Sequence, residues 1–175
     1  MSVTTKKIAM MGMLLAAQVV AGMFFSIKLP LVTIGFIFLP LSITSMLYGP
    51  LWGAAAAVMG DFLIAALGPY GYYPPMATTA FLSGLIYGLF LYRKPITIPR
   101  VSLCVITESL LCSVLLQTYW LTTLMNKAYL VLLPTRLFQN ALVAPVSIIC
   151  IYIVAPRVLA VAGKIFGATP SLAGK

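Results

Sequence analysis

The stretch from Leu51 to Tyr92 constrains the fold of this chain most strongly, because it carries a single ionised side chain, Asp61. The segment GPYGYYPPM divides the stretch into two apolar halves. Pro50 suits the first turn of a helix, where its missing N–H costs nothing, and Gly68-Pro69 predicts the end of that helix. Such a helix is about 27 Å long, close to the hydrocarbon thickness of a bilayer. The stretch therefore predicts two helices that cross a membrane as a hairpin.

The composition extends this prediction to the whole chain. Of the 175 residues, 62% are hydrophobic and 7% are charged, a balance that a soluble domain of this size would not tolerate on its surface. The apolar residues form continuous runs without the period-two alternation of a membrane β-barrel, so they predict helices. We expect one all-α domain over residues 1–175, embedded in a lipid bilayer as a multi-pass protein of a cell membrane.

The apolar runs predict six transmembrane helices. We place them at residues 8–27, 35–48, 50–67, 76–92, 101–124 and 134–155. The second run contains Pro40, where we expect a kink. Residues 26–34 contain Lys28 and Pro30, and we expect them to form a loop.

The distribution of positive charge predicts the orientation. If both termini are cytoplasmic, only Lys28 and Lys127 lie outside the membrane, in the connections between predicted helices. The inner ends then hold Lys6, Lys7, Arg93, Lys94, Arg100, Arg157, Lys164 and Lys175. This is a clear positive-inside bias, so we expect cytoplasmic termini and an outward-facing tyrosine loop at residues 70–75. The net charge of +9 is then explained by basic residues that orient the helices and lie beside anionic lipid headgroups. We therefore expect no nucleic-acid partner.

Several features of catalytic or cofactor-dependent proteins are missing from the sequence. It has no histidine, no phosphate-binding GxxxxGK[ST] loop and no nucleophile–base pair, so we expect neither an enzyme nor ATP hydrolysis by this chain. Cys104, Cys112 and Cys150 lack CxxC spacing and fall within apolar runs, which predicts core packing and no metal site. We therefore expect no cofactor on this chain. No inverted repeat of broken helices is evident, which argues weakly against a self-sufficient secondary transporter.

Polar residues within predicted spans are costly in a membrane and are candidates for function. By their positions along the fifth and sixth helices, we expect Gln117, Trp120, Arg136 and Gln139 to converge near the outer leaflet, beneath the tyrosine loop. Amides, an aromatic face and a guanidinium fork would suit a flat heteroaromatic ligand that carries a carboxylate. The alternatives are that Trp120 and the tyrosines form an interfacial belt, and that Arg136 pairs structurally with Asp61.

Small residues in the first helix suggest a close helix contact. Gly12 and Ala16 are four residues apart, as are Ala17 and Ala21, so each pair lies on one face. The contact is either within the bundle or with a partner.

Three stretches of the sequence together resemble a known family. YGPLWGAAAAVMGD, GPYGYYPPMATTAFLSGLIYGLFLYRK and LLPTRLFQNALVAP, with QTYWL before the last, resemble the folate-type substrate-binding subunits of energy-coupling factor (ECF) transporters. The resemblance covers about residues 5–155. It implies a six-helix protein of a prokaryotic cytoplasmic membrane that binds a vitamin at its outer face and is gated by its first and third loops. It also implies partners, namely a transmembrane coupling subunit and two cytoplasmic ATPases that use the ATP.

The same resemblance assigns roles to individual residues. It implies that Gln117, Trp120 and Arg136 line the vitamin site and that Tyr70 and Tyr72 belong to its lid. Several relatives carry an arginine and a lysine at the positions of Met23 and Gln139, which leaves Lys28 as the nearest substitute for holding the glutamate tail of folate.

The resemblance also places the contact with the coupling subunit in the first helix. That contact is made by small residues in an AxxxA pattern, which implies Gly12 and Ala16 by position, or Ala17 and Ala21 by residue type.

The sequence therefore predicts a folate-binding subunit of an ATP-driven vitamin importer. Riboflavin, thiamin or pantothenate remain alternative ligands of the same kind of subunit. A stand-alone transporter that uses Asp61 or Glu108 as proton carriers is a second class of function, and a structural assembly protein is a third.

Overall fold

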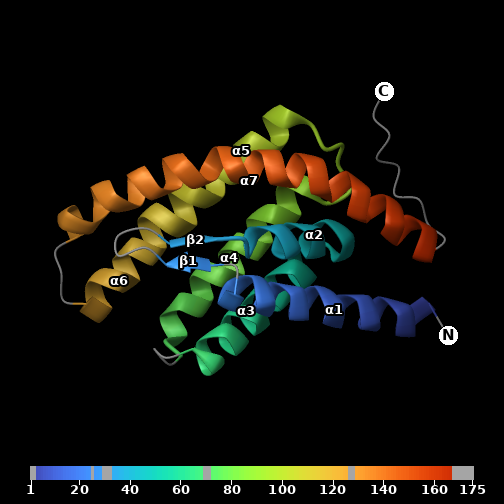
Figure 1. Ribbon diagram of the computed structural model, residues 1–175, viewed down its shortest axis with the longest axis horizontal. Helices are drawn as coiled ribbons and strands as arrows, with labels where there is room; N and C mark the ends of the chain where they lie inside the picture. The colour runs from blue at the N-terminus through green and yellow to red at the C-terminus, as the bar shows by residue number, and fades with distance from the viewer. Residues whose placement is uncertain (1–2, 25, 29–32, 69–71, 126–128, 167–175) are drawn as a thin grey trace.

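The computed structural model in Figure 1 describes residues 3–24, 26–28, 33–68, 72–125 and 129–166. Helices dominate the fold. The helices are α1 (Val3–Phe24), α2 (Phe38–Tyr48), α3 (Pro50–Leu67), α4 (Pro74–Leu91), α5 (Ile98–Glu108), the π-helix η1 (Ser109–Gln117), α6 (Thr118–Met125) and α7 (Tyr129–Phe166). A short antiparallel hairpin, β1 (Ser26–Lys28) and β2 (Thr33–Gly35), joins α1 to α2. Since α5, η1 and α6 follow one another without a break, the described residues form six helical segments, in agreement with the number of apolar runs.

The helical segments pack into one elongated bundle (Figure 1). The long helix α7 arches along one side, α1 and α3 lie on the opposite side, and α2 and α4 pass between them. The first turn of α1 and the last turn of α7 lie at the same end of the bundle, which we call the terminal end. The β1–β2 hairpin and α6 lie toward the other end, which we call the hairpin end.

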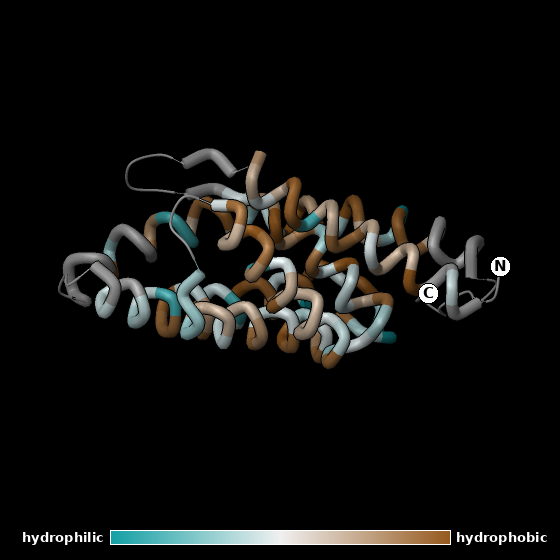
Figure 2. The backbone as a smooth tube through the Cα atoms, turned by 90° about the horizontal axis from the view of Figure 1, so that it is seen from below, coloured by the Kyte–Doolittle hydropathy of each residue, from teal (hydrophilic) through white to brown (hydrophobic). Residues whose placement is uncertain are grey.

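The hydropathy and length of the helices identify a membrane protein. The helical stretches Pro50–Leu67, Pro74–Leu91, Ile98–Trp120 and Leu137–Ala160 are long and apolar enough to cross a bilayer. Hydrophobic residues recur along the whole bundle and hydrophilic positions are sparse (Figure 2). The apolar helix α2 has 11 residues and is only about 16 Å long, so it does not cross a bilayer alone.

The hairpin of α3 and α4 forms where the sequence predicts it. Pro50 occupies the first turn of α3, and the helix ends at Leu67 with Gly68 as its C-cap. Glycines let the two helices meet: a Cβ atom on Gly84 would lie 2.6 Å from the carbonyl oxygen of Gly53, and one on Gly88 would collide with Pro50. This close approach fixes the register of α3 against α4 and thereby positions the cavity walls described below.

Two prolines have roles that differ from the prediction. The kink expected at Pro40 is absent because α2 begins at Phe38, which places Pro40 in the first turn, where no backbone hydrogen bond is lost. The sixth span was expected to begin at Pro134, but α7 runs from Tyr129 to Phe166 and includes this proline. Prolines are tolerated within membrane helices when neighbouring groups satisfy the freed carbonyl groups.

The prolines of α7 share one face of the helix. Pro134, Pro145 and Pro156 are spaced by eleven residues, which is about three turns, and all three are exposed. A proline bends a helix away from its own side, so three prolines on the outer face bend α7 in one direction. The arch of α7 over the bundle in Figure 1 agrees with this arrangement.

The residues expected to form a loop between the first two helices include the β1–β2 hairpin. Ser26 lies opposite Gly35 and Lys28 opposite Thr33, so the hairpin returns the chain directly to the start of α2.

The apolar core lies toward the terminal end, where Tyr87 of α4, Val101 and Cys104 of α5 and Ile151 of α7 are at most 2% exposed. Cys104 and Cys112 are buried there as free thiols.

Candidate ligand-binding site

A cavity of about 400 Å³ opens among the helices on the hairpin side of this core. Its volume falls within the range of roughly 300–1,000 Å³ of sites for small molecules. Its apolar walls include Phe38, Leu41, Ile64, Met76 and Val105. Polar residues also line it, namely Gln18, Asp61, Thr79, Ser83, Glu108, Ser109, Ser113, Gln117, Gln139, Asn140 and Ser147. Apolar walls with this many polar groups are typical of a site for a specific ligand.

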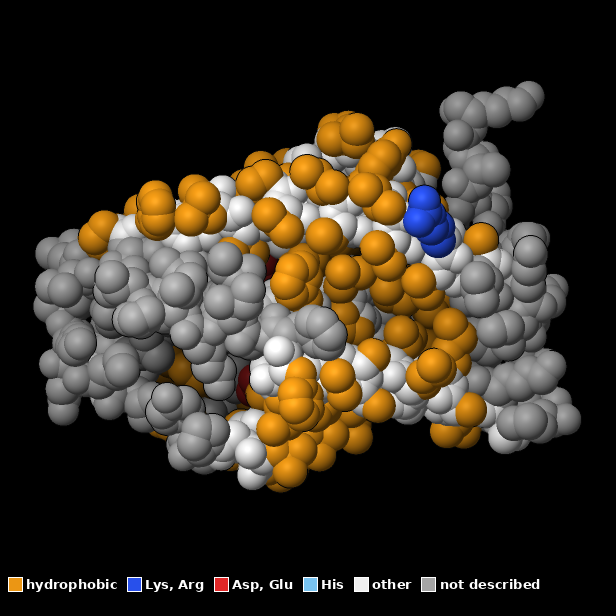
Figure 3. All heavy atoms as spheres, in the orientation of Figure 1, with side chains coloured by type: hydrophobic (Ala, Val, Ile, Leu, Met, Phe, Trp, Pro, Cys, Tyr) orange, Lys and Arg blue, Asp and Glu red, His pale blue; other side chains and the backbone are white. Residues whose placement is uncertain are grey.

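Both acidic residues of the chain line this cavity. The sequence has two Asp and Glu residues in total, Asp61 on α3 and Glu108 at the end of α5. On the face of the molecule drawn in Figure 3, acidic side chains are visible only as dark patches deep within hollows. Because carboxylates within a membrane bundle are costly and normally serve a cavity or a partner, their joint presence marks the cavity as functional.

Glu108 is held in place by α4. The hydroxyl group of Ser83 donates a hydrogen bond to Oε1 of Glu108 at 3.1 Å. Among the described residues, Ser83 alone donates a hydrogen bond to this carboxylate. The described residues that line the cavity include no Lys or Arg that could form an ion pair with it. The remaining acceptor positions of Glu108 are therefore available to a ligand or to water.

Two polar atoms at the cavity are buried without a hydrogen-bond partner among the described residues. They are Oε1 of Gln18, whose side chain is 2% exposed, and the hydroxyl oxygen of Thr79. Gln18 packs directly over Gly60 of α3, where a Cβ atom would collide with its amide. Because buried polar atoms in folded proteins almost always have partners, these two atoms are candidates for hydrogen bonds to a ligand or to water.

The π-helix η1 determines which residues of the fifth helical segment face the cavity. Glu108 and Gln117 both line it, although they are nine residues apart. Nine residues are two and a half turns of an α-helix, which would place them on opposite faces. A π-helix, whose hydrogen bonds run from i to i+5, has about 4.4 residues per turn, so nine residues complete about two turns. Only the wider helix places Glu108 and Gln117 on one face.

The cavity wall is continuous from η1 to α7. The amide of Asn140 donates a hydrogen bond of 3.0 Å to the hydroxyl group of Ser113. Both residues line the cavity, together with Gln117 and Gln139. This bond joins the two amide-rich segments into one polar wall.

The residues predicted from the sequence are only partly brought together. Gln117 and Gln139 line the cavity, whereas Trp120 and Tyr72 are not among the described residues that do so. The ring of Trp120 packs edge-on against Tyr119 at 5.1 Å, and its buried Nε1 has no partner among the described residues. Tyr72 packs edge-on against Phe62 on α3, with the ring centroids 5.0 Å apart.

Three predicted residues are described only in part or not at all. Arg136 belongs to α7, one turn before Asn140, and Lys28 is the last residue of β1. The side chains of these two residues lie outside the described part of the chain, and so does the whole of Tyr70. Figure 1 shows β1 and the first part of α7, to which Lys28 and Arg136 belong, toward the hairpin end. Binding of a ligand carboxylate by Arg136, and the alternative pairing of Arg136 with Asp61, therefore both remain predictions.

The small residues of α1 divide between two faces. Gly12, Ala16 and Ala17 are exposed, Ala21 is half-buried, and a Cβ atom on Gly12 would meet nothing within 4 Å. The face of α1 that packs within the bundle is instead marked by the buried Gln18 and Gly22. The pair Gly12 and Ala16 is thus turned away from the bundle.

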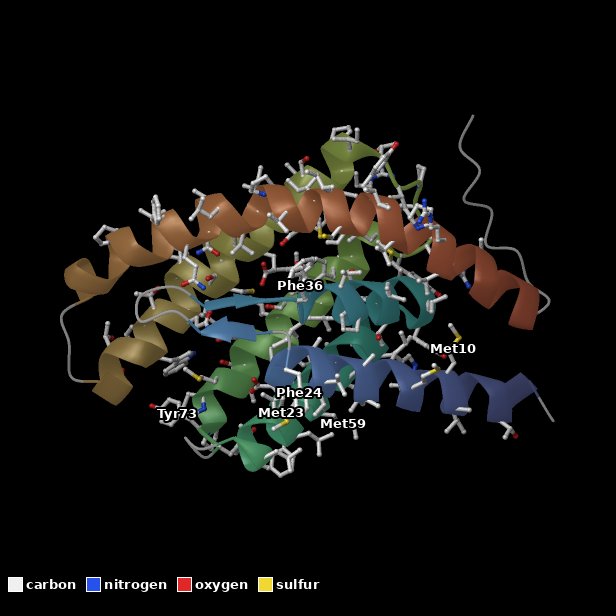
Figure 4. The ribbon with its side chains drawn as sticks, viewed as in Figure 1. Met10, Met23, Phe24, Phe36, Met59 and Tyr73 are labelled. Carbon is white, nitrogen blue, oxygen red and sulfur yellow. The ribbon has the colours of Figure 1, made fainter. Side chains whose placement is uncertain are left out.

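Large apolar side chains extend this outer face. Met13 and Val20 of α1 are 75% and 47% exposed. Met23 and Phe24 of α1 and Met59 of α3 project from the same edge of the bundle (Figure 4). The outer face of α1 is therefore apolar over most of the helix.

Several cavity residues were not predicted as site residues from the sequence, namely Gln18, Thr79, Ser83, Ser109, Ser113 and Ser147. A signal for Gln18 was present, since it is the only amide in the run from Ile8 to Ile27. Serine and threonine give no such signal, because they occur throughout membrane helices with their hydroxyl groups bonded to the preceding turn.

Comparisons with known proteins find relatives that match most of the chain. A family profile described as "ECF-type riboflavin transporter, S component" matches residues 2–156. A protein of Clostridium novyi (strain NT) named "Folate transporter FolT" is 35% identical over 143 residues, which cover 81% of this chain and 83% of that protein. A protein of the same name from Leuconostoc mesenteroides subsp. mesenteroides is 25% identical over 151 residues, 82% of this chain and 81% of that protein.

The fold also matches a solved structure. A structure titled "Crystal structure of FolT bound with folic acid" superposes with a TM-score of 0.81 at 32% sequence identity. The match covers 87% of this chain and 94% of that one.

Proposed function

Because this chain belongs to the family of S components of ECF-type transporters, we propose that it is the folate-binding membrane subunit of an ATP-driven vitamin importer. S components are transporter subunits and not a class of enzyme. In this proposal the chain carries no cofactor, and partner subunits hydrolyse the ATP. It captures folate at the outer face of the membrane and releases it inside after docking on a coupling subunit that carries two ATPases.

The observation that carries the ligand assignment is the cavity itself, in a fold shared with a FolT structure that holds folic acid. Its amides and hydroxyl groups suit the hydrogen-bonding edge of a pterin ring. Phe38, which is half-buried, lines it and provides an aromatic surface against which a flat ring packs. Riboflavin is the second candidate, because the matching family profile is described by that vitamin.

We propose that the glutamate tail of folate points toward the hairpin end. The tail is anionic, and Asp61 and Glu108 within the cavity would repel it. Arg136 and Lys28 are placed toward the hairpin end by their positions in α7 and β1, and a guanidinium or ammonium group there would pair with the tail carboxylates. Tyr70 and Tyr72 would then close over the tail as part of a lid.

The proposed orientation places the terminal end of the bundle in the cytoplasm. Arg93 and Lys94 follow α4, Arg100 lies in the first turn of α5, and Arg157 lies in the last third of α7. In Figure 3 a compact basic patch lies in the half of the molecule nearer the terminal end. Positive charge concentrated at this end supports its cytoplasmic location, with all six helical segments within the membrane and the cavity nearer the outer face.

We propose that the outer face of α1 contacts the coupling subunit. The exposed pair of Gly12 and Ala16 allows a partner backbone to approach closely, and Met13 and Val20 beside it offer apolar contact. Ala17 and Ala21, on the flank of this face, form the rim of the same contact.

Uptake of labelled folate by bacterial cells that lack their own folate transport tests this function. Cells that express this chain with a coupling subunit and two ATPases should accumulate folate, and cells that express an ATPase variant unable to hydrolyse ATP should not. Uptake by this chain alone that collapses with the proton gradient would contradict the proposal and favour a secondary transporter. Accumulation of riboflavin instead of folate would keep the transporter class and reverse the ligand assignment.

A further inference from the structure

The end of the cavity next to the apolar core, which we call the deep end, holds Glu108, and no cationic partner of Glu108 occurs among the described residues that line the cavity. Glu108 lies beside Ser83, and the residues around it include the buried Tyr87, Val105 and Cys112. The described residues that line the cavity offer Glu108 no Lys or Arg, and their single hydrogen bond to it comes from Ser83 at 3.1 Å. A carboxylate in this position is stabilised by a ligand that brings N–H groups to it.

The geometry of a carboxylate selects a particular kind of ligand edge. Two carboxylate oxygens accept two parallel N–H donors side by side, as they do from a guanidinium fork. A 2-amino-4-oxopyrimidine ring presents such a fork, because its ring N–H stands next to its exocyclic amine. The pyrimidine edge of a flavin differs, since its ring N–H lies between two carbonyl groups, and those carbonyl oxygens would face the carboxylate oxygens.

We propose that Glu108, positioned by Ser83, is the residue that selects a 2-aminopterin ring over a ring with a 2-carbonyl group, and so sets the vitamin specificity of this site. The inference rests on the proposed folate-binding function and deepens it. The ring lies against the half-buried Phe38, and its fork of N–H groups points to Glu108.

The second carboxylate of the cavity does not serve this purpose. Asp61 lies on α3 and Glu108 on α5, and the register of α3 against α4 places them at different depths. Gly53 and Gly84 are in contact, so Ser83 is level with the first half of α3, whereas Asp61 lies about two turns further toward the hairpin end. Asp61 is therefore nearer the middle of the ligand, where it does not meet the pyrimidine edge.

A pair of ligands that differ in one group tests this inference. Folate and its 2-oxo analogue, in which a carbonyl replaces the exocyclic amine, have the same tail, so interactions at the hairpin end cancel in the comparison. The purified wild-type chain should bind folate about 10- to 100-fold more tightly than the analogue, the effect of one charge-assisted hydrogen bond. In the isosteric Glu108→Gln variant, which still accepts from Ser83, the ratio should fall below about threefold.

Asp61→Asn is the matched control, because it removes the other carboxylate of the cavity. It should change both affinities by a similar factor and preserve the ratio. Equal binding of the two ligands by the wild-type chain would overturn the inference even if the Glu108 variant failed to fold. An unchanged ratio in Glu108→Gln, with tight folate binding by the wild type, would overturn it while leaving the proposed function intact. Absence of folate binding by the wild type would instead contradict the proposed function.

Discussion

The close approach of α3 and α4 predicts a large difference between two glycine substitutions of the same kind. A methyl group added by Gly84→Ala would lie 2.6 Å from the carbonyl oxygen of Gly53 and 2.7 Å from the Cα of Ala54. To reach an ordinary contact of 3.4 Å, the helices must separate by 0.8 Å, the difference between 3.4 and 2.6 Å. The atoms in the way are backbone, so a change of rotamer does not relieve the overlap. The same substitution at Gly12 meets nothing within 4 Å.

The magnitude follows from opposing terms. Overpacking of a well-packed interior costs about 1–3 kcal/mol. Moving α4 away from α3 also stretches the 3.1 Å hydrogen bond that the hydroxyl group of Ser45 on α2 donates to the carbonyl oxygen of Gly84 on α4, which contributes about 1 kcal/mol. The gain in helix propensity from glycine to alanine offsets about 1 kcal/mol. The net destabilisation of Gly84→Ala is therefore about 2 kcal/mol, which lowers the melting temperature by about 4–8 °C.

Thermal unfolding of the detergent-purified chain, followed by the fluorescence of Trp52 and Trp120, measures this difference. Gly84→Ala should melt several degrees below the wild type. Gly12→Ala should melt at the same temperature or slightly above it, because it gains helix propensity without a collision. Equal melting temperatures for the two variants would refute the reasoning that a glycine contact fixes α3 against α4.

Two further predictions separate ligand binding from transport. Gly60→Ala should weaken folate binding about tenfold, because the new methyl group displaces the amide of Gln18 from the cavity. It should leave the melting temperature within about 2 °C, since only this flexible amide has to move. Unchanged folate affinity would show that Gln18 does not contact the ligand. Gly12→Leu should abolish folate uptake while the purified variant binds folate normally, because it fills the face proposed for the coupling subunit. Ala141→Leu, an equally bulky change at an exposed position of α7, should retain uptake, and loss of uptake in both variants would argue against a specific contact on α1.

The sequence was sufficient to predict the helices because length and hydropathy determine them directly. The third helix was correct at both ends, since Pro50 and Gly68 act through local backbone geometry. The same local argument was wrong for Pro134, because a proline within a membrane helix depends on neighbouring groups that the sequence does not place. Pro40 was expected to bend a helix that in fact begins two residues before it.

The candidate site was less predictable than the fold. Gln117 and Gln139 were predicted from their polarity and line the cavity, but Gln117 shares a face with Glu108 only because η1 is a π-helix. No residue pattern in Ser109–Gln117 indicates a π-helix, so α-helical periodicity places Glu108 on the wrong face. Ser83 likewise belongs to the site through its hydrogen bond to a residue 25 positions away, which only the packing of α4 on α5 creates.

The central claim is that this cavity binds folate, and a fluorescence titration of the purified wild-type chain tests it most directly. Trp120 lies three residues after Gln117, which lines the cavity, so quenching of its fluorescence should report occupancy of the cavity. The account predicts tight, saturable quenching by folate that riboflavin does not compete away, with a marked loss of affinity in an Arg136→Ala variant. Saturable binding of riboflavin with no response to folate would contradict it.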